Sequence, residues 1–216
     1  IPRENNPGKK FFSYANTVTT INFDKTSKGH GWVGVRFQNS ENEEYNEIII
    51  HVKFKETNPT LQQETLGSLG VNLIYGAYFY SDNPRRLIES LYDDIAVDDL
   101  EIDMIDFAGA AFEYVDNRLM SLQLVKNKMT DAVIFNSMGS NMLPADVLYK
   151  KNIFAVRGSF RPVTKVNIDM LQNGLDMFMK DADCTMEETE VLFEITISNL
   201  QSGGDIDERD FLDRVD

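Results

Sequence analysis

Segments with the composition of β-strands alternate with segments of helical pattern along most of this 216-residue chain, and this order constrains the fold more than any other feature. Helices separate these segments, and strands joined through helices pair in parallel by crossover connections. We therefore expect an α/β fold with a mostly parallel sheet and crossover helices. The expected strands are LEIDMIDF (100–107), DAVIFNS (131–137) and NIFAVRG (152–158), and the expected helices are at 61–80, 83–95, 117–129, 144–151 and 167–181.

The N-terminal part lacks this alternation. GWVGVRF (31–37) and NEIIIHVKF (46–54) are β-rich and flank a polar stretch, which is typical of a β-hairpin with a long turn. We expect residues 1–56 to form an arm and this hairpin, as an extension of an α/β core at 57–184. In the helix expected at 61–80, several apolar residues share one stripe, and its glycines favour close packing against a neighbour. The stripe holds Leu61, Leu66, Leu69, Leu73 and Ala77.

Residues 185–216 form a third, acidic segment. Thr185 and Glu188 have capping-box spacing, which predicts a helix. Phe193, Ile195 and Ile197 alternate with polar residues, which is instead typical of a strand. We favour the helix. The final DERDFLDRVD begins an amphipathic pattern without a stop signal, as expected of a polypeptide that continues further.

Charge and composition limit the classes of partner that this chain is expected to bind. The net charge is −14, and residues 181–216 hold twelve acidic side chains against two arginines, so the chain should repel nucleic acid. We expect no membrane partner, because no apolar run is long enough to span a bilayer. Cys184 is the single cysteine, which favours the cytoplasm. We also expect no metal site, because the only histidines, His30 and His51, lie apart in the β-rich region.

Polar side chains gather where the expected strands end. Ligands of an open α/β sheet bind beyond the carboxyl ends of its strands. A carboxylate, an amide, hydroxyls and guanidinium groups together suit a phosphorylated small molecule. The side chains expected at these ends are Asp106, Asn136, Ser137, Arg157, Ser159 and Arg161.

The stretch RGSFRPVTKVN (157–167) has the clearest chemical pattern. It connects an expected strand to an expected helix, so backbone N–H groups and the helix dipole could face an anion. Gly158 would allow close approach of a phosphate, and Pro162 would stiffen the loop. Asn167 is the expected helix N-cap.

These residues resemble the nucleotidyltransferase superfamily that adenylylates nicotinamide or nicotinate mononucleotide and phosphopantetheine. Its motif Gly-Ser/Thr-Phe-Asp-Pro-x-Thr/His-x-Gly-His is similar to the segment that holds Gly158, Ser159, Phe160, Pro162 and Thr164. The resemblance implies that Ser159 and Thr164 approach the triphosphate of ATP bound with Mg²⁺, and that the helix beginning at Asn167 receives it. The whole chain also resembles a longer bacterial family that is often labelled nicotinamide- or nicotinate-nucleotide adenylyltransferase.

Three positions depart from that motif. Arg161 replaces the aspartate, Val166 the glycine and Asn167 the histidine that would stabilise charge during transfer. The resemblance therefore implies a degenerate adenylyltransferase-like domain that binds a nucleotide or phosphorylated metabolite.

The alternative is a non-enzymatic interaction or oligomerisation module. The hydrophobic N-terminal strands and the glycine-containing helix would then mediate self-association, and the acidic tail would bind a basic partner. A third hypothesis concerns residues 199–210, which have the outline of a calcium loop but lack its acidic ligands, so a helix stop and an Asp-capped helix start are expected there instead.

Overall fold

The chain divides into two compact units, Ile1–Ile134 and Phe135–Asp216. The computed structural model describes residues 9–24, 26–40, 43–181 and 184–216. The division after Ile134 differs in position from the segment boundaries expected at 56 and 184. The first unit contains one four-stranded sheet, and two separate two-stranded sheets follow it in the chain.

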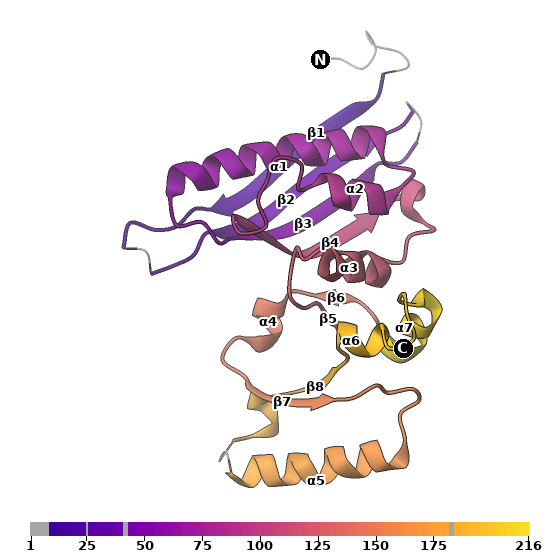
Figure 1. The fold of residues 1–216 in the computed structure, drawn as a ribbon. Coiled ribbons are helices and arrows are strands. Elements are labelled where there is room, and N and C mark those ends of the chain that lie inside the picture. The colour runs from indigo at the N-terminus through magenta and orange to yellow at the C-terminus, as the bar shows by residue number, and fades with distance from the viewer. Residues whose placement is uncertain (1–8, 25, 41–42, 182–183) are drawn as a thin grey trace. The chain divides into compact units, whose positions relative to one another are not determined.

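Unit 1 contains a four-stranded antiparallel sheet in the order β1-β2-β3-β4 (Figure 1). Its helices pack on one face, where they share a single apolar core with β2, β3 and β4. The strands are β1 (Phe11–Thr19), β2 (His30–Gln38), β3 (Asn46–Phe54) and β4 (Leu100–Ala108). The helices are α1 (Pro59–Phe79), α2 (Pro84–Ser90), the short 3-10 helix η2 (Ala110–Phe112) and α3 (Asn117–Lys126).

The main sheet corrects the expected fold class, because it is antiparallel instead of mostly parallel. A single helix between two strands returns the chain to the starting end of the sheet and so gives a parallel pair. Between β3 and β4 lie both α1 and α2 with the turns that follow, and the chain enters β4 from the opposite end. The expected hairpin 31–37/46–54 is confirmed as β2 and β3, which form the centre of this sheet.

Local signals set the starts of α2 and α3 as expected, although both helices end before the expected residues 95 and 129. The Asn83 side chain accepts a hydrogen bond from the Arg86 N–H, and Pro84 occupies the first position of α2. The Asp116 side chain caps α3 by accepting from the Arg118 N–H. In α1, Leu69, Leu73 and Ala77 are fully buried, which confirms the C-terminal part of the predicted stripe, whereas Leu61 is exposed.

Unit 2 is smaller and contains the parallel pairing. β7 (Asn152–Arg157) pairs in parallel with β8 (Thr189–Glu194), and α5 (Lys165–Asp181) is the crossover helix between them. The strand expected at 131–137 is reduced to β5 (Ile134–Phe135), which pairs with β6 (Asn141–Met142). The remaining helices are α4 (Pro144–Leu148), the 3-10 helix η3 (Met186–Glu188), α6 (Ile197–Leu200) and α7 (Glu208–Val215).

The helix favoured for the start of the acidic segment is wrong, because residues 189–194 form β8. The alternation that indicated a strand there was the better guide. Thr185 and Glu188 do interact, with the Thr185 hydroxyl donating to the Glu188 carboxylate at 3.0 Å, but only a 3-10 turn follows. Pairing with β7 buries Thr189 and half-buries Val191 and Leu192, which outweighs the local capping signal.

None of the helices in the described part of the chain has both the length and the apolar character that crossing a membrane requires.

Candidate functional site

Polar groups at the start of the loop between β7 and α5 are paired with residues of β8 in the same unit. The Gly158 N–H donates to the Glu194 carbonyl at 3.1 Å and so extends the β7–β8 ladder. Arg157 lies opposite Glu194 in the register and forms a bidentate ion pair with it, with Nε–Oε2 3.0 Å and Nη2–Oε1 2.8 Å. Two of the groups expected to contact a phosphate are therefore occupied by β8.

The start of α5 is capped by side chains of the same loop. The Thr164 N–H donates to Asn167 Oδ1 at 2.8 Å, and the Asn167 N–H donates to the Thr164 hydroxyl at 3.3 Å. This reciprocal pair is a capping box, which satisfies helix N–H groups that an anion would otherwise bind. Thr164 is the cap and the helix begins at Lys165, which corrects the expected N-cap at Asn167.

Phe160 anchors the loop to the sheet. Its ring is almost fully buried and meets Phe193 edge to face, with centroids 5.2 Å apart. Its backbone has φ of 46°. At Gly158, a Cβ would lie 2.9 Å from the Phe160 ring, so the glycine accommodates this ring. Gly158 and Phe160, which resemble nucleotidyltransferase positions, thus turn the chain and fix it to β8.

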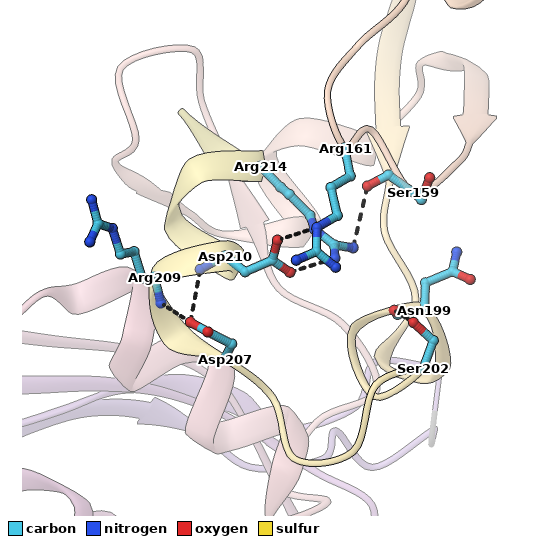
Figure 2. A network of polar contacts seen from close by, with 8 residues as sticks. All are labelled: Ser159, Arg161, Asn199, Ser202, Asp207, Arg209, Asp210 and Arg214. Carbon is cyan, nitrogen blue, oxygen red and sulfur yellow. Dashed lines mark hydrogen bonds and ion pairs between the residues drawn. The ribbon is translucent and has the colours of Figure 1, made fainter.

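Arg161 and Arg214 meet at one carboxylate (Figure 2). Arg161 Nε lies 2.7 Å from Asp210 Oδ1, and the Arg214 guanidinium pairs with the other oxygen of Asp210. Arg214 also donates to the Ser159 carbonyl at 3.4 Å. Asp207 holds α7 in place by accepting from the N–H groups of Arg209 and Asp210, which confirms the expected Asp-capped helix start. The loop is thereby tied to α7.

Asp106 and Asn136 do not belong to the loop. Asp106 lies on β4 in unit 1, where it accepts a hydrogen bond from Asn117 Nδ2 at 2.8 Å. Burial, followed by the negative charge of Glu47, raises the pKa of Asp106. Asn136 closes the β5–β6 turn in unit 2 by accepting from the N–H groups of Met138 and Ser140, both at 2.9 Å. The predicted row of strand ends does not exist, because β4 and β5 are not strands of the parallel sheet.

A buried polar cluster on β3 and β4 was not predicted. His51 Nδ1 lies 2.6 Å from Asp103 Oδ1, and Lys53 Nζ lies 2.5 Å from Asp103 Oδ2. Burial raises the pKa of Asp103, but the hydrogen bonds and positive charges of His51 and Lys53 lower it more, and the net shift is downward. The only tryptophan, Trp32, meets the His51 ring edge to face at 4.9 Å.

A β-bulge brings Asp103 to His51. His51 pairs with Met104 and Val52 pairs with Ile102, which leaves Asp103 as an extra residue of β4. Strand alternation alone does not reveal such a step, so this cluster could not be predicted from the strand pattern. Within the described residues, no group of three or more His, Cys, Asp and Glu side chains is arranged to hold a metal ion.

The outer face of α1 carries a second apolar stripe, which was not predicted either. We define it as five exposed residues, whose side chains are 36–66% exposed: Val71, Ile74, Tyr75, Tyr78 and Phe79. The opposite face of α1 is buried on the sheet. No charged residue occurs from Thr65 to Ser81, and the spacing of the outer stripe was visible in the sequence beside the inner one.

Gly67 lies in the same outer face. It is exposed, and a Cβ added there would meet nothing within 4 Å. By contrast, Gly70 and Gly76 face Tyr14 and Leu87, which leave little room for a side chain. A glycine inside a helix costs about 1 kcal/mol relative to alanine. Packing within the chain accounts for Gly70 and Gly76 but not for Gly67.

No protein-family model, curated protein or solved structure matches this chain. The resemblance to nucleotidyltransferases consequently rests on residues 158–164 alone.

Proposed function

We propose that this protein is a non-catalytic protein-interaction module that binds through the outer stripe of α1. The single observation that carries the proposal is the exposure of Val71, Ile74, Tyr75, Tyr78 and Phe79 on one helix face without an intervening charge. A helix that is apolar on both sides is usually covered on both sides.

The composition of the stripe supports this role. Interface centres are enriched in aromatic residues and depleted of charged ones. Full burial of an aromatic side chain covers about 150–250 Å², so the exposed halves of Tyr75, Tyr78 and Phe79 offer roughly 300 Å². With Val71 and Ile74 the patch reaches the size at which exposed apolar surface on a monomer is often functional, about 300–600 Å².

Site-specific photo-crosslinking tests the proposal in living cells. A photoreactive phenylalanine analogue at Tyr75 or Tyr78 should give covalent protein adducts above the mass of the monomer. The matched control is Tyr149, an aromatic residue of unit 2 that is 69% exposed. Equal adducts from Tyr149 and Tyr75, or none from Tyr75 and Tyr78, would contradict the proposal.

A second candidate function is binding of a nucleotide or phosphorylated small molecule at the loop, with Mg-ATP as the natural ligand of an adenylyltransferase-like domain. One observation favours it. Arg157 and Arg161 flank Ser159 and Phe160 in sequence, and Arg214 contacts the Ser159 carbonyl, so three guanidinium groups share the two carboxylates of Glu194 and Asp210. The side chains of Arg157 and Arg161 are about two-thirds exposed. The buried Arg214 Nε has no hydrogen-bond partner among the described residues.

Thermal unfolding with and without millimolar Mg-ATP tests this second candidate. Ligand binding to the folded state raises the melting temperature. Arg161→Ala should remove that rise, whereas Lys165→Ala, next to the loop, should keep most of it. An unchanged melting temperature for the wild-type protein would reject the candidate. For either function we propose a cytoplasmic location, which the single cysteine supports.

A further inference from the structure

We infer that the occupant of the outer stripe of α1 is a second copy of this chain, packed antiparallel with its two-fold axis at Val71. The inference rests on the proposed function, because it names the partner of the same surface. Three features of α1 carry it: the period of the stripe, the position of Gly67, and the charges at its two ends.

The period of the stripe matches a second helix. Val71, Ile74 and Tyr78 of the stripe continue towards the N-terminus through Gly67 and Glu64, and these five positions follow one another at alternating steps of three and four residues. Residues that repeat with this 3.5-residue period form a seam, along which two helices pack with interlocking side chains.

Reversal about Val71 places large residues of the stripe over smaller residues of the preceding turn, with Ile74 facing Ser68 and Tyr75 facing Gly67 of the partner copy. In a two-fold interface, each residue meets its counterpart on the other side of the axis. Gly67 precedes Val71 by one helical turn and Tyr75 follows it by one turn, so Gly67 faces the partner's Tyr75. The ring then fills the space above Gly67, where a Cβ would have no neighbour.

The charges favour the antiparallel orientation. Glu64 is exposed at one end of the seam, and Lys10 Nζ lies 5.2 Å from the centroid of the Tyr78 ring at the other end. Both ends are two turns from Val71, so Glu64 of each copy meets the partner's Lys10 and Tyr78. A parallel pair would instead place Glu64 against the partner's Glu64, which is repulsive.

The size of the stripe predicts a weak dimer. A standard interface buries about 800 Å² on each partner, and the apolar stripe supplies roughly half of that. We therefore expect a dissociation constant of about 1–100 μM, so that monomer and dimer exchange over ordinary laboratory concentrations.

Sedimentation velocity of the purified chain from low to high micromolar concentration tests the inference. The wild-type protein should shift from monomer to dimer as concentration rises, and Val71→Glu should abolish the shift. Val166→Glu on α5 is the matched control, because Val166 is 63% exposed and Val71 is 66% exposed. A dimer that survives Val71→Glu unchanged would overturn the inference.

Charge exchange and cysteine pairing test the orientation. Glu64→Lys and Lys10→Glu should each weaken the dimer at least several-fold, and combining them should restore it. In a Cys184→Ser background, Val71→Cys should oxidise to a disulfide dimer by itself. Gly67→Cys and Tyr75→Cys should instead cross-link only when the two variants are mixed. Efficient cross-linking of each variant with itself would indicate a parallel pair and contradict the inference.

These outcomes separate the two proposals. A chain that stays monomeric at all concentrations, while Tyr75 photo-crosslinks to a different protein in cells, would overturn the second copy as partner and leave the interaction function standing. A monomeric chain without photo-adducts at Tyr75 and Tyr78 would overturn both.

Discussion

Arg161 on the loop after β7 forms an ion pair with Asp210 of α7, with Nε and Oδ1 2.7 Å apart. The side chain of Arg161 is 64% exposed, and that of Arg214, which shares Asp210, is 4% exposed. The Asp210 carboxylate therefore pairs with one solvated guanidinium group, that of Arg161, and one buried guanidinium group, that of Arg214. The arginine expected to bind a phosphate already has a protein partner, and Asp210 controls how available it is.

Asp210→Asn should destabilise unit 2 more than Arg161→Ala. The exposed pair of Arg161 with Asp210 contributes at most about 1 kcal/mol. Loss of the Asp210 charge leaves Arg214 buried without a counter-ion, which costs roughly 2–4 kcal/mol. Hydrogen exchange of the α7 and β8 amides measures the difference, and equal protection in the two variants would contradict the assigned roles.

Gly67→Ala and Gly76→Ala should change stability in opposite directions. Gly67→Ala should raise the free energy of unfolding by about 0.5–1 kcal/mol, because the helix gains propensity and the new Cβ meets nothing in the chain. Gly76→Ala should lower it by about 1–3 kcal/mol, because its Cβ would lie 3.0 Å from Leu87 Cγ and 3.2 Å from Ser90 Oγ.

Denaturant unfolding followed by Trp32 fluorescence measures both variants, since Trp32 is the only tryptophan and lies in unit 1. If α1 pairs as inferred, Gly67→Ala should also weaken dimerisation while it stabilises the monomer. A stabilising effect of Gly76→Ala would contradict the packing of α1 against α2.

Phe160→Ala should unfold the loop and destabilise unit 2 by about 3 kcal/mol, because the buried ring fills the space beside Gly158 and Phe193. Val163→Ala, at an exposed position of the same loop, should change stability by less than about 0.5 kcal/mol. Hydrogen exchange at β7 and β8 distinguishes the variants. A small effect of Phe160→Ala would show that the ring does not anchor the loop.

Acidification should destabilise unit 1 through Asp103. The folded-state pKa of this carboxyl lies below its ordinary value of 3.8. A depressed pKa contributes stability that is fully present above 3.8 and is lost as pH falls through the folded-state pKa. We therefore expect the free energy of unfolding to fall as pH drops below this value.

Asp103→Asn isolates this contribution. The variant should be less stable than wild type at pH 6, and the difference should shrink at pH values below 3.8. Trp32 fluorescence reports it directly, because Trp32 contacts His51. A difference between the two proteins that does not depend on pH would reject the role of the charge.

The sequence predicted local structure well and long-range pairing poorly. Caps at Asn83 and Asp116 set helix starts where they were expected, because a cap acts within one turn. The direction of β4 depends on how α1, α2 and the turns after them return the chain to the sheet, and local propensity says nothing about that. The turn at Asn136 shortened an expected strand, because its side chain accepts from two backbone N–H groups.

The candidate site shows the same limit. Gly158, Ser159 and Thr164 lie in a strand-turn-helix as expected. The residues that pair with polar groups of this segment, Glu194, Asp210 and Arg214, lie 36 or more residues further along the chain than the groups they contact. Partners at that separation are fixed by the tertiary fold. The outer stripe of α1 could have been found from spacing alone, but its exposure could not.

The extra residue in β4 has a consequence for changes in chain length. Two residues separate Ile102 from Ile105, both of which are buried, where an even ladder would have one. Deletion of either Asp103 or Met104 would therefore restore regular pairing without moving the apolar side chains to the wrong face. Only deletion of Met104 would keep the Asp103 carboxylate beside the His51 imidazole. The two deletion variants would therefore have β4 strands of equal length, but only one of them would retain the buried polar cluster.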